Sequence, residues 1–450
     1  METQETSLRV LMFPWLGQGH ISPYFELAKK LSTRKFYIYF CSTPINLISI
    51  NKKLIKYSNH NIQPIELHLP TFPNLPPHYH TAIGLPPHLF PTLSKSLEMA
   101  ASEFSQILKN LKPDLLIYDM FTPWIPDLAM SYNVPAVHFQ CSGAATISYL
   151  YWSVKNRGLT YPYPTIFLKD PEIMKMKKSS ILDMEDEKQA LDWFEKSCGV
   201  VLIRTCKEIE EKYVDFLQVL SRKKIVPVGS LIDQIDESDG ELVFAEIIQW
   251  LNKKERLSTV FVSFGSECYL SYKEMEELAC GLELSNVNFI WVIRFPGGEK
   301  TRADVALPPG FLERVKGRGM IVEGWAPQKK ILGHSSVGCF VSHCGWNSVS
   351  ESMYFGVPII AIPMHNDQPS NARLAVEVGV CLEVMKDENL EFGREEVARV
   401  IKEVVVEKSG EGFRSRVKKV SEKMRMKGEE EIDGVVEELK KICRENIKHY

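Results

Sequence analysis

The stretch Trp325–Gln368, WAPQKKILGHSSVGCFVSHCGWNSVSESMYFGVPIIAIPMHNDQ, decides the fold. Within it, the apolar run Val337–Ser342 predicts a strand buried on both faces, HCGWNS predicts a turn, and a helix follows from about Ser348. The apolar run Val357–Pro363 predicts the next strand. A glycine-containing turn between a parallel strand and a helix N-terminus is suited to bind phosphate, because backbone N–H groups and the positive end of the helix dipole point at the ligand. Neither the G-x-x-x-x-G-K-[ST] nor the G-x-G-x-x-G pattern is present in this turn, however.

The same alternation of strands and helices runs through the whole chain. In the first half, strands are expected at Leu8–Pro14, Phe36–Cys41, Ile62–His68, Asp114–Tyr118, Val134–Phe139 and Val200–Arg204. In the second half, further strands are expected at Thr259–Phe264, Asn288–Arg294 and Met320–Glu323. Strands separated by helices form parallel βαβ units, so the pattern predicts an α/β protein with two doubly wound domains. The acidic, polar stretch Asp233–Gly240 is the expected linker.

Composition and charge exclude several classes of protein. The chain of 450 residues has 54 Lys and Arg against 57 Asp and Glu, and the net charge of −3 gives no reason to expect nucleic acid as a partner. The longest apolar stretch, Tyr354–Met364, is about half of the ~20 residues that a membrane helix needs. The run Leu8–Leu16 lacks the basic region and cleavage site of a signal peptide. We therefore expect a cytoplasmic enzyme with no membrane span.

The ten cysteines do not resemble a metal site. No two of them have C-x-x-C spacing, which argues against a zinc ribbon or a thioredoxin-type motif. Several lie inside apolar, strand-like runs, where cysteine behaves as a small buried hydrophobe. Reduced thiols are expected, as in the cytosol.

Two polar residues stand at strand ends in the first half. His20 follows the strand Leu8–Pro14 at the strand-to-helix turn, and Asp119 ends the strand Asp114–Tyr118. The carboxyl ends of parallel strands lie along one edge of a sheet, where doubly wound domains bind their ligands. A carboxylate on one imidazole nitrogen would leave the other nitrogen free to take a proton from a hydroxyl. The residues alone leave open two plainer roles, a helix-capping histidine and an N-capping aspartate.

The segment from Pro64 to Pro91 interrupts the alternation with eight prolines and four histidines. Proline is excluded from helix interiors and central strands, so a long surface loop is expected. Such loops often bind ligands, and others only connect elements; the sequence leaves both interpretations open. The aromatic-rich segment Tyr149–Tyr163 is likewise either part of an acceptor site or part of a core.

The stretch Trp325–Gln368 resembles, without gaps, the signature box of the plant family-1 UDP-dependent glycosyltransferases, and the resemblance extends across essentially all of the chain. It implies a GT-B fold, in which two Rossmann-like βαβ domains face each other across a cleft. Residues 1–237 would form the N-terminal, acceptor-binding domain, joined by a C-terminal helix at about 438–450. Residues 238–437 would form the C-terminal domain that binds the UDP-sugar.

The resemblance also implies the roles of individual residues in donor binding. Those expected at the nucleoside are Trp325, stacked on uracil, Ala326 and Gln328 at the uracil edge, and Glu351 at the ribose. Those expected at the diphosphate are His343, Asn347, Ser348, the backbone near Trp346, and Ser266. Asp367 and Gln368 would hold hydroxyls of the donor sugar, and a Gln at the end of the box favours UDP-glucose. Each residue alone would pass for an ordinary core or helix residue, but the joint spacing favours ligand binding.

The family's catalytic dyad falls at His20, in G-x-G-H-x-x-P, and at Asp119. The resemblance implies a hexosyltransferase that inverts the anomeric carbon in a single displacement, with His20 as general base and Asp119 as its partner. No cofactor and no metal are expected. No two Asp residues stand two apart, so the Asp-x-Asp of metal-using enzymes is missing, and the helix N-terminus with His343 would stabilise the leaving UDP.

Three stretches resemble a narrower group that adds sugar to existing glycosides: FPWLGQGHISPYFELAKKLS, YFCSTPINL, and FVSFGSECYLSYKEMEELACGLELS followed by NFIWVIRFP. The expected partners are a UDP-sugar and a small-molecule glycoside, bound by a monomer that forms a disaccharide branch. The candidate acceptor residues are Gly17, Pro76, His80, Cys141 and Ser142. The alternatives are an aglycone glucosyltransferase, a UDP-sugar epimerase of the same fold, an NAD-dependent oxidoreductase, and a UDP-sugar-binding protein without activity.

Overall fold

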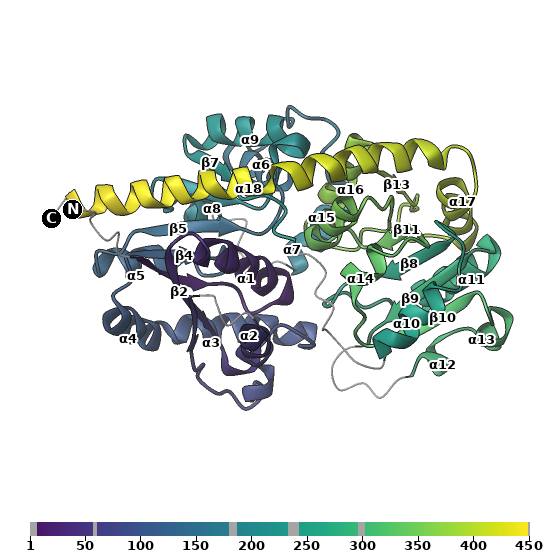
Figure 1. Ribbon diagram of the computed structural model, residues 1–450, viewed down its shortest axis with the longest axis horizontal. Coiled ribbons are helices and arrows are strands. Elements are labelled where there is room, and N and C mark those ends of the chain that lie inside the picture. The colour runs from purple at the N-terminus through teal and green to yellow at the C-terminus, as the bar shows by residue number, and fades with distance from the viewer. Residues whose placement is uncertain (1–6, 57–60, 180–186, 233–242, 296–301, 449–450) are drawn as a thin grey trace. The chain divides into compact units, whose positions relative to one another are not determined.

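The computed structural model describes residues 7–56, 61–179, 187–232, 243–295 and 302–448 (Figure 1). Their contacts divide the chain into two compact units. Unit 1 comprises residues 1–161, 180–231 and 427–450, and unit 2 comprises residues 162–179 and 232–426. Each unit is built around one parallel sheet, as the alternation of strands and helices predicts.

Unit 1 contains a seven-stranded parallel sheet in the order β3-β2-β1-β4-β5-β6-β7. Its strands are β1 (Leu8–Phe13), β2 (Phe36–Ser42), β3 (Ile62–Glu66), β4 (Leu115–Tyr118), β5 (Ala136–Gln140), β6 (Val200–Ile203) and β7 (Lys224–Pro227). Its helices are α1 (Gln18–Ser32), α2 (Pro44–Lys56), α3 (Phe90–Met99), α4 (Ala101–Leu111), α5 (Ile125–Ser131), α6 (Ala144–Lys155), α8 (Glu187–Glu195) and α9 (Lys207–Ser221), with short 3₁₀ turns η1 (Pro77–Tyr79) and η2 (Pro87–Leu89). Pro64 lies in β3, at an edge of the sheet, where a missing backbone donor is tolerated.

Unit 2 repeats this arrangement with a six-stranded parallel sheet in the order β10-β9-β8-β11-β12-β13. Its strands are β8 (Thr259–Ser263), β9 (Asn288–Ile293), β10 (Gly319–Glu323), β11 (Val337–Ser342), β12 (Ile359–Ala361) and β13 (Cys381–Glu383). Its helices are α7 (Asp170–Ser179), α10 (Val243–Leu251), α11 (Tyr272–Ser285), α12 (Ala303–Ala306), α13 (Phe311–Arg314), α14 (Gln328–Leu332), α15 (Trp346–Phe355), α16 (Gln368–Val378) and α17 (Arg394–Val405). The long helix α18 (Gly410–Lys448) belongs to unit 2 up to residue 426 and to unit 1 from residue 427.

Both sheets are buried on both faces. Along β1, Val10 and Met12 belong to one hydrophobic cluster, whereas Leu11 and Phe13 belong to another. Successive side chains of a strand point to opposite faces, so the two clusters cover the two faces of the sheet. This double burial explains why the strands read as continuous apolar runs in the sequence.

The division into units differs from the sequence-based boundaries in three places, the first being the boundary between the units, which falls after residue 231 and not after 237. Residues 162–179 belong to unit 2, although they precede the expected boundary at 237. They are held there by Arg373 of α16, which pairs with Glu172 at 2.8 Å, with both side chains less than 10% exposed. The C-terminal return to unit 1 begins at 427 rather than at about 438, and Ile432 and Leu439 pack into the core of that unit. The expected linker Asp233–Gly240 lies outside the described residues.

In each sheet the strand order reverses direction once. The chain moves outward on one side of β1 and then returns to place β4 on its other side; β8 and β11 are related in the same way. Ligands of doubly wound sheets bind beyond the carboxyl ends of the strands at this switch point. The turns that follow β1 and β4, and those that follow β8 and β11, are therefore the places to search for a site.

Candidate functional site

His20 and Asp119 meet at the switch point of unit 1. His20 lies in the first turn of α1, the helix that follows β1, where its backbone N–H donates to the carbonyl of Gly17 at 3.0 Å. Asp119 follows β4. The imidazole Nδ1 lies 2.7 Å from Oδ2 of Asp119, and the Asp119 side chain is only 1% exposed. The second carboxylate oxygen accepts from the backbone N–H of Phe121 at 3.2 Å, which holds the carboxylate in this orientation.

The environment of His20 favours its protonated form. Burial disfavours the charged imidazolium, but the charge and hydrogen bond of Asp119, helped by the thiol of Cys141, outweigh it and raise the pKa of His20 well above 6.5. Burial raises the pKa of the Cys141 thiol, so the thiol is neutral at physiological pH. Since Cys141 follows β5, three adjacent strands each contribute one residue to this cluster.

The same cluster has donors that a metal ion could use. One ligand atom from each of His20, Asp119 and Cys141 lies within 4.8 Å of the others, and the described part of the chain offers no second group of this kind. Such a donor set suits zinc. The 2.7 Å separation between the imidazole and the carboxylate is instead that of a hydrogen bond, which already engages Asp119.

The loop that follows β3 contacts the turn before His20. The backbone N–H of Ala82 donates to the carbonyl of Leu16 at 2.9 Å, beside Gly17, which precedes α1 as its N-cap. His80 is 5% exposed, and its carbonyl accepts from the hydroxyl of Thr43 at 2.7 Å. Two further candidate acceptor residues lie in turns: Pro76 precedes η1, and Ser142 lies between β5 and α6. Of the candidate acceptor residues, the structure thus places Gly17 and Cys141 beside His20.

The HCGWNS turn of unit 2 has the strand-turn-helix geometry expected from the sequence. His343 follows β11, Cys344 adopts a left-handed conformation with φ of 64°, and Gly345 precedes α15. Among the described residues, α15 has no side-chain cap and no acidic residue in its first turn. Its N-terminus therefore presents its dipole without a competing carboxylate.

His343 is a neutral, tightly packed imidazole. Burial, with nearby His365 and Arg294, lowers its pKa to about 3. A Cβ atom on Gly265 or Gly345 would lie 2.8 or 2.7 Å from the imidazole, so only glycine fits at these two positions. Within the described residues, Nδ1 of His343 is buried and has no hydrogen-bond partner, which leaves it available to a ligand.

The residues expected at the nucleoside lie together beside this turn. The amide nitrogen of Gln328 donates to Oε2 of Glu351 at 2.8 Å and to Oγ of Ser348 at 3.3 Å. The adjoining Ala326 is buried. Trp325 is 56% exposed and contacts the ring of Phe244 on one side, so it is a surface platform and not a core residue.

Asp367 and Gln368 lie at the start of α16. The side-chain oxygen of Gln368 accepts from the backbone N–H groups of Met364 and His365, at 2.9 and 3.0 Å, and its amide nitrogen lies 3.4 Å from Nδ1 of His365. Asn371 donates to the carboxylate of Asp367 at 2.9 Å and to the carbonyl of Cys344 at 3.1 Å. Asn371 therefore ties the start of α16 to the HCGWNS turn, and its position four residues after Asp367 was the available sequence signal.

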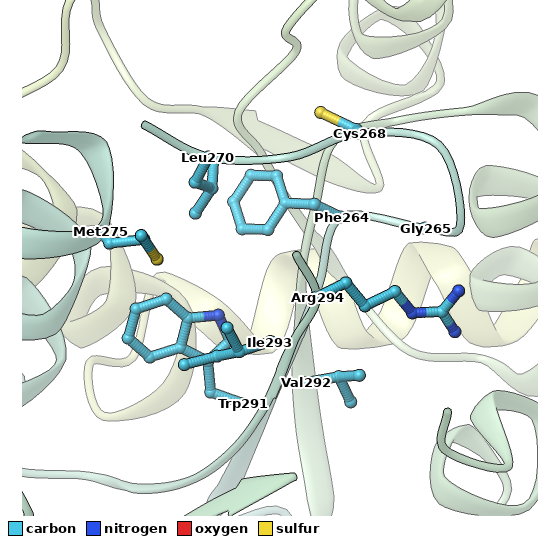
Figure 2. A pocket seen from close by; sticks show the side chains of 9 residues that line it. All are labelled: Phe264, Gly265, Cys268, Leu270, Met275, Trp291, Val292, Ile293 and Arg294. Carbon is cyan, nitrogen blue, oxygen red and sulfur yellow. The ribbon is translucent and has the colours of Figure 1, made fainter. Parts of the chain in front are cut away.

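Three remaining candidates surround the turn. The side chain of Trp346 is buried, which suits the expected contact of its backbone with the diphosphate. Asn347 and Ser266 are partly exposed. Ser266 follows Gly265 in the turn after β8. Sequence reasoning missed Arg294, which follows β9 and lines a small pocket of about 10 Å³ with Phe264, Gly265 and Cys268 (Figure 2). A basic residue at the end of an apolar strand was the signal that could have drawn attention to it.

Comparisons with known proteins agree with this geometry. Residues 193–425 match the family model described as UDP-glucoronosyl and UDP-glucosyl transferase, and residues 6–233 match the one described as glycosyltransferase, N-terminal domain. Within the described residues, no helix has the length and apolarity to cross a membrane.

Similar proteins span the whole chain. The beta-D-glucosyl crocetin beta-1,6-glucosyltransferase of Gardenia jasminoides is 49% identical, over 97% of this chain and 99% of its own. A mogroside IIIx synthase of Siraitia grosvenorii is 51% identical, over 95% of this chain and 96% of its own. The same fold is seen in the crystal structure of UGT73P12 of Glycyrrhiza uralensis, which is complexed with glycyrrhetinic acid 3-O-monoglucuronide. The TM-score is 0.83 at 24% sequence identity, and the match covers 99% of this chain and 98% of that one. The expected GT-B fold with two Rossmann-like domains is thereby confirmed.

Proposed function

The chain belongs to the UDP-glucoronosyl and UDP-glucosyl transferase family of enzymes, and from this premise we propose that it transfers glucose from UDP-glucose to a sugar hydroxyl of a small-molecule glycoside. The product would be a β-linked disaccharide branch, formed with inversion at the anomeric carbon. The observation that carries this proposal is the 2.7 Å contact between Nδ1 of His20 and the buried carboxylate of Asp119, at the switch point of unit 1.

We propose that His20 is the general base. Asp119 holds Nδ1–H, so the opposite nitrogen, Nε2, would accept the proton of the acceptor hydroxyl. The acceptor oxygen would form a bond to the anomeric carbon as the bond from that carbon to the phosphate oxygen of UDP breaks. The proton remains on the imidazole, and the imidazolium is stabilised by Asp119. Base assistance of this kind contributes roughly 10²–10⁴-fold to a rate.

Unit 2 would bind the donor. The exposed indole of Trp325 offers a face for uracil, and the carboxylate of Glu351 can accept the two ribose hydroxyls. The leaving UDP would be stabilised at the N-terminus of α15 together with His343, whose neutral imidazole can donate a hydrogen bond. Asp367 and the side-chain amide of Gln368 would hold hydroxyls of glucose.

The glycoside acceptor is supported by the name of one similar protein, which acts on a glucosyl crocetin. Two alternatives remain, an aglycone glucosyltransferase of the same family and a UDP-sugar epimerase of the same fold. An epimerase needs no acceptor, whereas the proposed base needs an acceptor hydroxyl.

The decisive experiment incubates the purified protein with UDP-glucose and matched pairs of aglycones and their monoglucosides, with mass spectrometry of the products. The proposal expects a gain of one hexose on monoglucosides. Product from aglycones alone would leave the family assignment intact but refute sugar–sugar transfer. Conversion of UDP-glucose without any acceptor would indicate an epimerase. His20→Ala is the control, since it should abolish transfer while UDP binding survives.

We propose further that the reaction needs neither a metal nor a cofactor, because His343 and the N-terminus of α15 can stabilise the leaving group. Activity lost in EDTA and restored by Mn²⁺ would refute this. The monomeric state and the cytoplasmic location remain proposals; all ten cysteines are free thiols, which suits a reducing compartment.

A further inference from the structure

Arg294 is a cation for which the described residues supply no anionic partner. It follows β9 directly, and burial lowers the pKa of its guanidinium. Among the residues that the structure describes, its Nε atom is buried without a hydrogen-bond partner, and no carboxylate forms an ion pair with it. Arg294 is partly buried, and a partly buried charge without a partner costs free energy. A ligand that supplies the opposite charge would remove this cost.

The position of Arg294 indicates which ligand that is. Arg294 and Gly265 line the same small pocket, and the backbone of Gly265 packs against the ring of His343. Figure 2 shows the guanidinium extending away from the apolar side chains of Met275 and Trp291. Because β9 and β11 flank β8, Arg294, Gly265 and His343 follow the carboxyl ends of three adjacent strands. The positive charge of Arg294 also contributes to the low pKa of His343, as expected if the two side chains lie close to each other.

The charge balance of the donor site calls for a cation. The diphosphate of UDP carries at least two negative charges, whereas His343 is neutral at physiological pH. Asn347 and Ser348 add only neutral donors. Another arginine of unit 2, Arg373, is already paired with Glu172. Arg294 is therefore a charged group placed to complement the diphosphate.

We propose that Arg294 binds the diphosphate of the UDP-sugar beside His343 and stabilises the negative charge on the departing UDP. This inference rests on the proposed function and adds to it a residue outside the Trp325–Gln368 box. A guanidinium is suited to the task because its planar donors can contact two phosphate oxygens at once.

The test compares UDP with uridine, which lacks the phosphates, on the full chain. UDP is measured by calorimetry, and uridine by ligand-observed NMR because we expect it to bind weakly without the phosphates. Arg294→Gln should weaken UDP binding by about 10- to 100-fold, since a charged hydrogen-bonding partner is lost, and leave uridine binding unchanged. Arg302→Gln is the matched control, because Arg302 is an exposed arginine of unit 2 whose ion pair with Asp304 lies at the surface.

Two results would overturn the inference. Unchanged UDP affinity in Arg294→Gln would show that Arg294 does not contact the diphosphate, and an equal loss for UDP and uridine would show a purely structural role. If Arg294→Gln does not fold, Arg294→Lys carries the test: it keeps the charge but not the planar fork, so UDP binding should weaken about 3- to 10-fold with uridine unchanged. Failure of the wild type to bind UDP would refute the proposed function itself, which separates the two failures.

Discussion

Asp119→Asn should move the pH dependence of transfer to lower pH. The hydrogen bond from His20 spans 2.7 Å, and the two side chains are 19% and 1% exposed, so solvent weakens this interaction little. A hydrogen bond to a charged group contributes about 1.5–3 kcal/mol. Replacing the carboxylate with a neutral amide removes that stabilisation of the imidazolium and should therefore lower the pKa of His20.

The assay is kcat/KM for the acceptor, measured from about pH 5 to pH 10 at saturating UDP-glucose. The base works in its neutral form, so the wild-type rate should rise with pH through the raised pKa of His20. In Asp119→Asn the rising limb should begin at lower pH, and the plateau should fall because the ring is held less firmly. Asp114→Asn is the matched control, since Asp114 is a carboxylate of the same unit that pairs with Arg9.

The same linkage has a consequence for stability. The pKa of His20 is higher in the folded than in the unfolded chain, so protonated His20 adds to the free energy of unfolding. This contribution is fully present below about pH 6.5 and is lost as the pH rises through the folded-state pKa. In Asp119→Asn the free energy of unfolding should therefore fall less over this pH range. A rising limb that stays at the same pH in Asp119→Asn, or moves to higher pH, would refute the assignment of His20 and Asp119 as a coupled pair.

Three other substitutions test further parts of the structure. Burial raises the pKa of Glu210 to about 7, so its charged form destabilises the fold at higher pH. Glu210→Gln should therefore add about 1–3 kcal/mol to the free energy of unfolding at pH 8.5 and little at pH 5. Chemical denaturation at the two pH values measures this difference. Gly265→Ala places a Cβ atom 2.8 Å from His343 and should weaken UDP binding. Gly84→Ala is the control, because Gly84 has a similar φ with open space around it, and it should leave UDP binding unchanged. Equal UDP affinities of the two variants would contradict the packing argument. Gln368→His removes an oxygen that accepts from two backbone N–H groups and should change the preference among UDP-sugars, and an unchanged preference would remove Gln368 as a selector.

The sheets were readable from the sequence because their strands are buried on both faces. Val337–Ser342 is a strand with the bounds that its apolar run predicts, and the other long runs differ by a few residues at their ends. Two short edge strands, Lys224–Pro227 and Cys381–Glu383, were not predicted. Each is a short edge strand that carries a charged residue, Lys224 or Glu383, so its apolar pattern is too short to be distinguished from a loop.

The membership of residues 162–179 in unit 2 could not be read from the sequence. Its anchor is the ion pair between Glu172 and Arg373, which are 201 positions apart in the chain. No local periodicity encodes such a pair, because its partners meet only when the units have folded. The same holds for Cys141, whose position beside His20 depends on β5 lying next to β4.

By itself, the sequence determined two doubly wound domains, the HCGWNS turn and the residue types of the candidate donor site, because these depend on local patterning and on spacing within one strand-turn-helix unit. Only the tertiary structure decided which side chains meet. It joined His20 to Asp119 across 99 positions, turned the oxygen of Gln368 toward backbone N–H groups, and left Arg294 without a carboxylate among the described residues. The physical reason is that hydrogen bonds and buried charges depend on atomic distances, and distances between remote residues are set by the order in which the strands pair.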